Sequence, residues 1–377
     1  MNFLLSDKQR RRRDEYRSFA QEELVPCGDG FARDNVRKAA RHGYLGLPIP
    51  REWGGLGEDF VTYILLIEEI SRVCASTGVI LAVHTSVGSF PLLYYGTVGQ
   101  KKRYLAGLAR GSLLGAFALT EAGAGSDAAA LQMTAVRTAD GRYRLNGSKL
   151  FITSGGEANL YTVFARTDPE KETRGITAFL VEKETPGLEI GPPERKMGLH
   201  GSVTTELRFN DVLLPAESRL GDEGQGFAIA MSLLDGGRIG IAAQGLGLAR
   251  AAIEETTAHF CSPGVRRKGA TPGQSASFTL ADLYTGLEAA RLLVYRAAIL
   301  KEAGVPCSKE ASMAKLFATD LAVTAATRCL DLWNLAGVRT ENPVSRYFCD
   351  AKVTQIYEGS NQIQRLVIVR ELLKNNL

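Results

Sequence analysis

The sequence has few of the features that mark membrane-spanning, secreted or metal-binding proteins. No apolar stretch near the N-terminus resembles a signal peptide, and no uninterrupted apolar run approaches the ~20 residues that span a bilayer. Only four histidines occur, and none has the spacing of metal ligands. We therefore expect a cytoplasmic protein with no membrane association and no structural metal. The histidines are His42, His84, His200 and His259.

Cysteine and net charge are also low. Six cysteines are scattered without a CxxC pair, so we expect free thiols rather than a disulfide framework. The 45 lysine and arginine residues exceed the 41 aspartate and glutamate residues by a formal charge of only +4. This excess is too small to indicate a nucleic-acid partner. The one dense basic run, residues 10–13, follows a possible capping box of Ser6 and Gln9, and we interpret it as a solvated helix face.

The composition is that of a globular protein, and the pattern of apolar residues divides the sequence into three stretches. The 377 residues, 45% of them hydrophobic, are enough for more than one core. Apolar residues three and four apart predict helices to about residue 112, and a period of two then predicts strands with turns at Asp140-Gly141 and Asn146-Gly147. Helical spacing returns afterwards. We predict an α+β fold with an N-terminal helical domain (1–115), a middle antiparallel β domain (116–226) and a C-terminal helical domain (227–377).

The segment from 350 to 369 places a carboxylate at a break between two apolar helical runs. Gly359 tolerates the left-handed conformation that ends helices, and Ser360 can cap the following helix. Glu358 is then at a helix C-terminus, where the macrodipole and apolar neighbours raise the pKa of a carboxyl group and make it a usable proton acceptor. The alternative is a solvated glutamate near a helix end, which position alone favours.

Two segments of the predicted β domain could contact a cofactor. GAGSDA at 123–128 has the letters of a dinucleotide-binding fingerprint, but strand-like sequence follows where that fingerprint needs a helix, so a nicotinamide site is not favoured. Its backbone N–H groups and Ser126 could bind a phosphate, and a structural tight turn is equally consistent. LFITSG at 150–155 could lie against a flat heterocycle with Thr153 at its edge, although an ordinary strand is the simpler interpretation.

The predicted helix at 233–253 is rich in glycine. Glycine inside a helix costs about 1 kcal/mol relative to alanine, so its recurrence indicates that something approaches the helix backbone closely. The approaching group could be a neighbouring helix or a ligand, and the sequence does not distinguish them.

Together and in this order, these segments resemble the acyl-CoA dehydrogenase family, most of all its short-chain (butyryl) members. The resemblance covers nearly the whole chain. The matching segments are AQEELVP, EEISRVCASTGVI, FALTEAGAGSD, NGSKLFITSG, LLDGGRIGIAAQ, EASMAKLFATD and DAKVTQIYEGSNQIQRLVI. The resemblance implies a helical domain, a β-barrel-like domain and a C-terminal four-helix bundle, with FAD between the last two and assembly as a homodimer or homotetramer.

The resemblance also implies a role for particular residues. Glu358 matches the catalytic base of the family's YEG motif, and Gly237 occupies the position from which some relatives supply that base instead. The implied substrate contacts are Ser126, Asp235, Arg238, Tyr357 and Gly359. The implied FAD contacts are Phe117, Leu119, Thr120, Gly125, Ser126, Phe151, Ile152, Thr153, Gln274, Ser360, Asn361 and Gln362.

The sequence departs from the family where a neighbouring subunit contacts the adenosine end of FAD. Pro263 stands where an arginine is expected, and a QxxGG segment is replaced so that Asp331, Asn334 and Leu335 occupy its positions. A shifted loop would let Arg266 or Arg267 supply the missing charge. We therefore predict an obligate homo-oligomer in which one of these arginines reaches the neighbour's cofactor.

The predicted function is FAD-dependent α,β-dehydrogenation of a short acyl-CoA thioester, with electron-transfer flavoprotein as the acceptor. Glu358 removes the α-proton and the flavin accepts a hydride in this scheme. One alternative is a biosynthetic dehydrogenase whose acyl group is carried on an acyl carrier protein. Another is a flavin-dependent oxygenase or a non-catalytic member of the same fold, against which the retained Glu358 argues.

Overall fold

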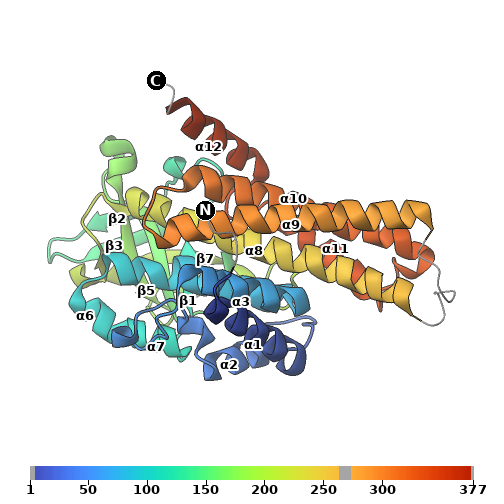
Figure 1. Ribbon diagram of the computed structural model, residues 1–377. Helices are drawn as coiled ribbons and strands as arrows, with labels where there is room; N and C mark the ends of the chain where they lie inside the picture. The colour runs from blue at the N-terminus through green and yellow to red at the C-terminus, as the bar shows by residue number, and fades with distance from the viewer. Residues whose placement is uncertain (1–4, 263–272, 375–377) are drawn as a thin grey trace.

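A computed structural model describes residues 5–262 and 273–374, and its two helical parts pack together with the strands to one side (Figure 1). The N-terminal helices are α1 (Asp7–Glu23), α2 (Arg33–Arg41), α3 (Phe60–Val73), α4 (Ala75–Val83), α5 (Phe90–Tyr95), α6 (Val98–Gln100) and α7 (Ala106–Arg110). The C-terminal helices are α8 (Gly226–Cys261), α9 (Gln274–Glu302), α10 (Ser308–Trp333), α11 (Pro343–Thr354) and α12 (Asn361–Lys374). The predicted α+β fold, with helices, then strands, then helices, is confirmed.

Local sequence signals set several helix ends. Ser6 and Gln9 form the expected capping box at α1, because the Ser6 hydroxyl accepts from Gln9 N at 3.2 Å and the Gln9 side chain accepts from Ser6 N at 3.0 Å. Asp59 caps α3 in the same way by accepting from Thr62 N at 2.6 Å. The predicted domain limits at 115 and 226 stay predictions.

The strands form one sheet. They are β1 (Gly115–Ala118), β2 (Thr134–Arg137), β3 (Tyr143–Thr153), β4 (Leu160–Arg166), β5 (Ile176–Glu182), β6 (Leu188–Ile190), β7 (Thr204–Leu214) and β8 (Arg219–Leu220). Their order is β6-β7-β3-β2-β4-β5-β8, with β1 beside β4. Most pairs are antiparallel as expected, but β1 and β2 pair with β4 in parallel.

One of the two predicted turns is wrong. Gly141, with φ of 84°, makes the turn between β2 and β3 as expected. Asn146-Gly147 instead lies inside β3, where the pairing with β7 shifts register between Leu145 and Gly147. A Cβ on Gly147 would lie 3.0–3.1 Å from Met133, so this glycine allows β3 to pass close to a neighbouring segment rather than to reverse direction.

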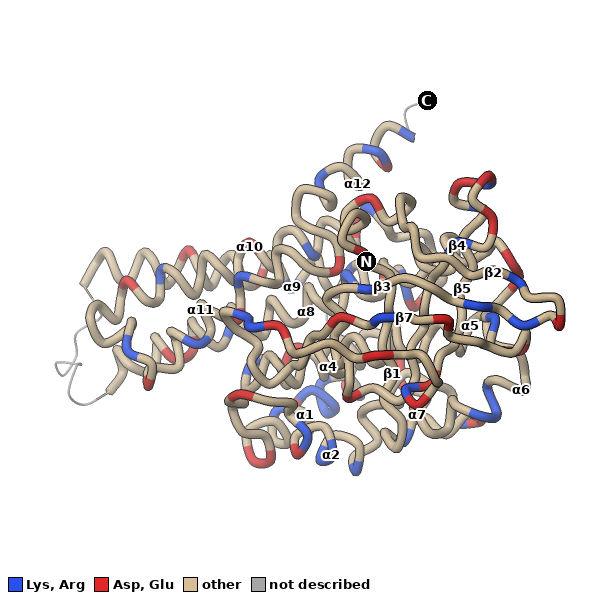
Figure 2. Tube along the Cα trace, turned by 180° about the vertical axis from the view of Figure 1, so that it is seen from behind, with Lys and Arg blue, Asp and Glu red and all other residues tan. Residues whose placement is uncertain are grey.

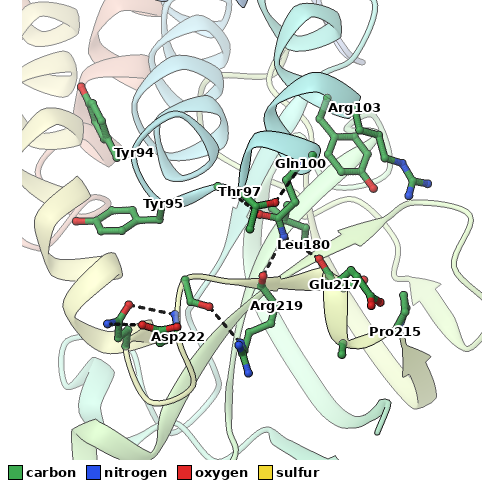
Figure 3. Close-up of a pocket in the computed structure, with 17 residues that line it drawn as sticks. Tyr94, Tyr95, Thr97, Gln100, Arg103, Leu180, Pro215, Glu217, Arg219 and Asp222 are labelled. Atoms are coloured by element: carbon green, nitrogen blue, oxygen red, sulfur yellow. Dashed lines mark hydrogen bonds between the residues drawn. The ribbon is translucent and has the colours of Figure 1, made fainter. Parts of the chain in front are cut away.

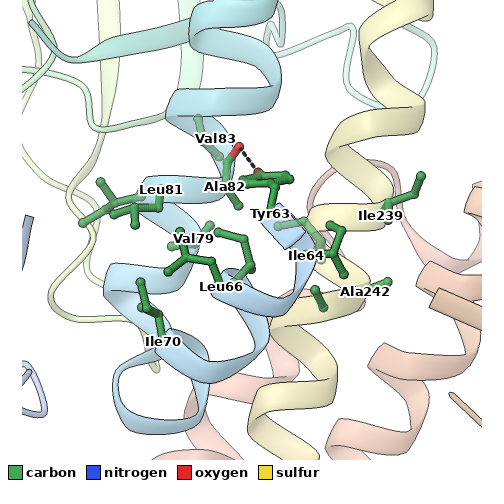
Figure 4. Packing of buried hydrophobic residues seen from close by; sticks show 14 of the residues in the cluster. Tyr63, Ile64, Leu66, Ile70, Val79, Leu81, Ala82, Val83, Ile239 and Ala242 are labelled. Atoms are coloured by element: carbon green, nitrogen blue, oxygen red, sulfur yellow. Dashed lines mark hydrogen bonds between the residues drawn. The ribbon is translucent and has the colours of Figure 1, made fainter. Parts of the chain in front are cut away.

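A core of α3, α4 and α8 joins the two helical parts. Figure 4 shows Ile64 and Leu66 of α3 together with Val79 and Leu81 of α4 and Ile239 of α8. All of these side chains are at most 1% exposed, and the Tyr63 hydroxyl donates to Ala82 O at 3.2 Å. Apolar burial of this kind stabilises folds by roughly 25 cal/mol per Å², so α8 is fixed along its length.

Buried ion pairs add to the packing of α8 on α3. Arg250 of α8 donates to Glu69 at 2.7 Å, and Arg291 of α9 donates to Glu68 at 2.9 Å. Both carboxylates lie in α3 and are buried. Along the Cα trace of the described residues, acidic and basic positions are interspersed (Figure 2).

Close backbone contact positions β1 beside the helices. A Cβ on Gly115 of β1 would lie 3.0 Å from the backbone of Gly88, which belongs to the π-helical segment His84–Ser89. Buried His84 accepts from Gly115 N through Nδ1 and therefore donates through Nε2 to Leu108 O, each at 3.1 Å. Burial lowers the pKa of His84 to about 4, which keeps the ring neutral in this role.

Among the described residues, two helical stretches are long enough and apolar enough in composition to span a membrane, although neither is an uninterrupted apolar run. They are Ala75–Tyr95 and Gly226–Cys261, and their most apolar windows are 94% and 67% buried inside the structure. Burial of this extent is what core helices of a globular protein show.

The glycines of α8 have more than one role. A Cβ on Gly245 would lie 3.0 Å from Ala318 O of α10, and a Cβ on Gly247 would lie 2.5 Å from Glu68 O of α3. These two positions confirm close packing between helices. Gly237 has a different neighbour, because the carboxylate of Glu358 approaches it instead of the backbone of another helix.

Replacement of Gly247 by alanine should destabilise the fold by about 1–3 kcal/mol, since α8 and α3 must separate. The matched control is Gly240→Ala in the same helix, whose Cβ would meet Ala82 and Tyr63 at ordinary distances of 3.5 and 3.6 Å. The control should be neutral or slightly stabilising because alanine favours helix. Thermal denaturation of both variants measures the difference, and equal melting temperatures would contradict the packing role.

Candidate active site

The turn between α11 and α12 carries Glu358. The helix before it ends at Thr354, several residues earlier than the sequence pattern predicts, so Glu358 is not in the last helical turn. Glu358 and Gly359 both have left-handed backbone, with φ of 52° and 86°. Ser360 caps α12 as predicted, accepting from Ile363 N at 3.4 Å. A glutamate in this conformation is strained, and strain of this kind is maintained where neighbouring contacts fix the backbone.

The Glu358 carboxylate is turned inward against α8. A Cβ placed on Gly237 would lie 2.7 Å from its Oε2 and 3.0 Å from its Cδ. Any side chain larger than hydrogen at 237 would therefore displace the carboxylate. Gly237 in α8 therefore leaves the space that the Glu358 carboxylate, on a turn distant in the sequence, occupies.

Burial raises the pKa of Glu358 to about 7, against the opposing attraction of Arg238 and then Lys315. The expected direction of the shift is therefore present, and burial, one of the two expected causes, is the largest; the other expected cause, a helix C-terminus, is absent because α11 ends at Thr354. A carboxyl group with a pKa near neutrality is a suitable general base.

Arg238 and Asp235 lie on the same helix as Gly237. Buried Arg238 donates to Asp235 at 3.0 Å, and Ser308 of α10 donates to the other carboxylate oxygen of Asp235 at 2.6 Å. Within the part of the chain that the structure describes, Arg238 Nε is buried without a hydrogen-bond partner. A cationic side chain fixed in this way adds positive potential beside Glu358.

Lys315 of α10 is a site residue that the sequence reasoning missed. Its side chain is fully buried, and Nζ donates to Gly359 O at 2.9 Å and to Asn361 Oδ1 at 2.8 Å. Burial lowers the pKa of Lys315 to about 7. The available signal was a lone lysine among small and apolar residues in EASMAKLF, on the face of a helix that faces inward.

Glutamines hold the same turn from two other sides. The Tyr357 hydroxyl donates to Gln244 of α8, whose amide nitrogen donates to Ala75 O at 3.0 Å. Gln364 of α12 donates to Gly359 O at 2.8 Å. Gln364 and Lys315 thus share the carbonyl oxygen of Gly359, while Gln244 holds the side chain of Tyr357, and together they restrict the turn. Among the described residues, the backbone N–H of Glu358 has no hydrogen-bond acceptor.

The predicted cofactor residues after Glu358 differ in exposure. The Asn361 side chain is buried and engaged inside the fold, because it accepts from Lys315 and donates to Thr319 at 2.9 Å and Asp320 at 2.7 Å. Its side chain therefore fixes the turn to α10. Gln362 is exposed, and flavin contact by 360–362 stays a prediction.

Two predicted cofactor segments of the β domain are brought together. Leu150 N donates to Thr120 O at 2.8 Å, and the buried Lys149 ammonium donates to Leu119 O at 3.0 Å and to Glu121 at 2.6 Å. Phe117 lies at the edge of the same region, packed edge to face on Phe164. Lys149 and Glu121 were not predicted, although a lysine within an apolar strand is a signal that could have found them.

An irregularity in β3 leaves the side chain of Phe151 exposed. The pairing with β7 shifts between Lys149 and Ile152, and Phe151 takes a left-handed φ of 56°. Its ring is left exposed, with 62% of the residue accessible, whereas Ile152 is buried and Thr153 is half-buried. An exposed aromatic ring in a strained backbone is suited to contact with a flat ligand.

The glycine-rich segment 123–126 forms an open turn. No atom lies within 4 Å of a Cβ placed on Gly123 or Gly125, and Gly125 and Ser126 are exposed. A short 3-10 turn (Ala128–Ala130) and then β2 follow, so the expectation that no helix follows is confirmed. This accessible backbone fits a phosphate better than a packed turn would.

The residues expected at the adenosine end of FAD are surface residues in this chain. Gln274 is exposed at the first position of α9, and Asp331 is exposed near the end of α10. Asn334 has a φ of 52°, and Leu335 is 86% exposed. Pro263, Arg266 and Arg267 lie outside the described residues.

A separate hollow lies where the N-terminal helices meet the β domain and the start of α8 (Figure 3). Gln100 crosses one side and donates to Glu217 O at 2.8 Å and to Arg219 O at 2.9 Å. Its lining contains none of the predicted site residues. The labelled lining residues are Tyr94, Tyr95, Thr97, Gln100, Arg103, Leu180, Pro215, Glu217, Arg219 and Asp222.

The arrangement of helices and strands is that of the acyl-CoA dehydrogenase fold, whose members are oxidoreductases. The family models for the N-terminal, middle and C-terminal domains of acyl-CoA dehydrogenase match residues 6–112, 116–212 and 224–373. The chain belongs to the acyl-CoA dehydrogenase family. An acyl-CoA dehydrogenase of Bacillus subtilis is 50% identical, with 95% of this chain and 96% of the relative covered.

Solved structures give the same result. Butyryl-CoA dehydrogenase from Megasphaera elsdenii is 42% identical, with a TM-score of 0.95 and coverage of 99% of this chain and 100% of the relative. A chain from work on the electron transferring flavoprotein of Acidaminococcus fermentans is 44% identical, with a TM-score of 0.94 and coverage of 99% and 100%. The predicted family, fold, enzyme class and FAD cofactor are confirmed.

Replacement of Lys315 by methionine should raise the pKa of Glu358 further, because a nearby positive charge is lost. The base acts in its deprotonated form, so the rate of flavin reduction should rise with pH through a midpoint of about 7 in the natural chain. The midpoint should move to higher pH in the variant. Stopped-flow measurement of flavin reduction across the pH range gives both midpoints.

The control for this variant is Lys309→Met in the same helix, where the lysine pairs with Glu310 at 3.6 Å. Its pH profile should match that of the natural chain. An unmoved midpoint in a Lys315→Met protein that still binds FAD would show that Lys315 has no electrostatic effect on the base.

Proposed function

We propose that this protein catalyses FAD-dependent α,β-dehydrogenation of short-chain acyl-CoA thioesters. The observation that carries the proposal is the Glu358 carboxylate, which is held against Gly237 with a pKa of about 7. The retained base also separates this function from a non-catalytic member of the fold.

The residues of the β domain fit the cofactor. The exposed ring of Phe151 offers a flat apolar surface, and the open backbone at Gly123 and Gly125 leaves room for a phosphate. FAD, when bound there, would supply the acceptor for a hydride from the substrate β-carbon. Thr153, Ser126 and Ser360 are the hydroxyl groups proposed to bind it.

Glu358 removes the substrate α-proton in the proposed reaction. The α-proton of a thioester is weakly acidic, so removal requires stabilisation of the enolate oxygen that develops. The backbone N–H of Glu358, which has no acceptor among the described residues, is a donor for that oxygen. Arg238 and Lys315 limit how far burial raises the pKa of Glu358. A fraction of the molecules therefore has a deprotonated Glu358 at neutral pH.

The proposed substrate and acceptor follow from the relatives. The butyryl-CoA dehydrogenase of Megasphaera elsdenii supports a short acyl chain, and the Acidaminococcus chain supports electron transferring flavoprotein as the acceptor. Asp235, Arg238, Tyr357 and Gly359 are proposed to surround the thioester. A cytoplasmic location remains part of the proposal.

We further propose that the chain acts as a homodimer or homotetramer. Figure 1 shows α12 projecting from the helical bundle. Leu366, Val369 and Leu373 of α12 are 66%, 52% and 57% exposed, and their spacing places them along one stripe. An apolar stripe on a projecting helix is suited to contact with a second copy. The proposed contact of Arg266 or Arg267 with the neighbour's FAD belongs to the same assembly.

Anaerobic titration of the purified FAD-bound protein tests the substrate. Butyryl-CoA should bleach the flavin, and longer acyl-CoA substrates should do so more slowly, with each methylene that cannot be buried forfeiting about 0.8 kcal/mol. A rate that rises steadily to long chains would contradict short-chain specificity. Bleaching by a butyryl carrier protein in preference to butyryl-CoA would instead support the carrier-bound alternative.

The double variant Leu366→Glu/Val369→Glu should reduce the oligomeric state, because burying two carboxylates in an apolar contact is costly. Size-exclusion chromatography with light scattering measures the mass. The control is Arg370→Glu at an exposed position of the same helix, which should leave the mass unchanged. An unchanged assembly in the double variant would exclude this stripe from the interface.

A further inference from the structure

Cys27 and Cys74 lie together although they are far apart in the sequence. Cys27 follows α1, and Cys74 lies at the junction of α3 and α4. Their sulfur atoms are 2.8 Å apart, whereas a disulfide bond is about 2.05 Å long. Both are free thiols, so the two sulfurs share a hydrogen bond in this structure.

Polar neighbours align the two sulfurs. Asn35 donates to Cys27 Sγ at 3.3 Å and to Thr77 Oγ1 at 3.0 Å, and the Thr77 hydroxyl donates to Cys74 Sγ at 3.2 Å. Cys74 also immediately precedes the first residue of α4, where the helix N-terminus favours negative charge. The hydrogen bond from Cys27 is the largest cause that lowers the pKa of Cys74 to about 6.

The pair differs from the other cysteines in its access and its partner. Cys27 is half-buried and opens toward the surface, and Cys74 is 3% exposed behind it. Cys261 is exposed and serves as a reference for an accessible thiol elsewhere in the chain. An accessible cysteine beside a second cysteine that can attack its sulfenic acid is the arrangement that converts oxidation into a disulfide rather than into higher oxidation states.

We propose that Cys27 and Cys74 form a reversible disulfide and make a redox modification site outside the active site. The hydrogen bond to Cys74 and burial raise the pKa of Cys27, and the two sulfurs share one proton. When that proton lies on Cys74, the more accessible Cys27 thiolate attacks hydrogen peroxide, the O–O bond breaks, and a sulfenic acid and hydroxide form. Cys74 gives its proton to that hydroxide, which becomes the first water, and the resulting Cys74 thiolate attacks the Cys27 sulfur. The S–O bond breaks, and the hydroxide that leaves becomes a second water after taking up a proton from solvent. Two electrons pass from the sulfurs to the peroxide, and a dithiol reductant reverses the change.

The bond would join segments that already meet around Gly201. Ala32 N donates to Gly201 O at 2.8 Å, and Gly201 N donates to Ser76 Oγ at 3.2 Å. The loop around 201 comes from the β domain, between β6 and β7. A disulfide at this point therefore restrains the N-terminal segment against α4 where both contact the β domain.

Peptide mapping of the FAD-bound protein tests the proposal. The reduced protein is treated with a small molar excess of hydrogen peroxide, its remaining thiols are alkylated under denaturing conditions, and it is digested with trypsin without reduction. Trypsin cleavage after Arg17, Arg33, Arg72 and Lys101 places the two cysteines in separate peptides, 18–33 and 73–101. We expect these peptides to be joined, and to separate after dithiothreitol.

Two variants make the result specific. Cys27→Ser should leave peptide 73–101 alkylated after the same treatment, and Cys261→Ser should give the same joined peptide as the natural chain. The proposal is overturned if peptides 18–33 and 73–101 stay separate in the oxidised natural chain, or if Cys27 ends as a sulfinic acid while Cys74 remains alkylated. The mapping of the natural chain decides the matter even if Cys27→Ser does not fold.

Discussion

The inward position of one carboxylate is the constraint on which this structure depends. Glu358 lies against the backbone of α8 only because residue 237 is glycine, and the burial that follows raises its pKa to about 7. The same burial would produce a protonated, inactive group if no positive charge opposed it. Arg238 and Lys315 supply that opposition from α8 and α10. Packing and electrostatics together therefore set the protonation of Glu358, the proposed base.

A base of this kind requires a fixed backbone, and the surrounding helices provide it. The left-handed backbone at Glu358 is held by Lys315 and Gln364 at the carbonyl of Gly359 and by Gln244 at the side chain of Tyr357. The β domain uses the same device, because buried Lys149 joins the segment at Leu119 to β3. Buried lysines that donate to backbone carbonyls thus position both the Glu358 turn and the predicted cofactor segments of the β domain, at the cost of desolvating an ammonium group.

Much of this arrangement could be predicted from the sequence, and the failures have physical causes. Periodicity gave the order of helices and strands, and the resemblance gave Glu358 and the cofactor. Asn146-Gly147 has the letters of a turn, but its function is close passage of β3 beside Met133, which depends on tertiary contact. Lys315 and Lys149 were missed because a buried lysine is defined by carbonyl groups remote in the sequence. Of the two causes expected for the Glu358 shift, burial is present and the helix end is not, because α11 ends before the turn.

The most direct measurement is flavin reduction by butyryl-CoA in Glu358→Gln. Because glutamine keeps the size of the side chain and removes the base, the account predicts intact FAD binding with reduction slowed by ~100- to 10,000-fold. The double variant Gly237→Glu/Glu358→Gly moves a carboxylate to the facing position on α8 and should restore part of the rate. Near-normal flavin reduction in Glu358→Gln would contradict the account and assign the proton transfer to another group.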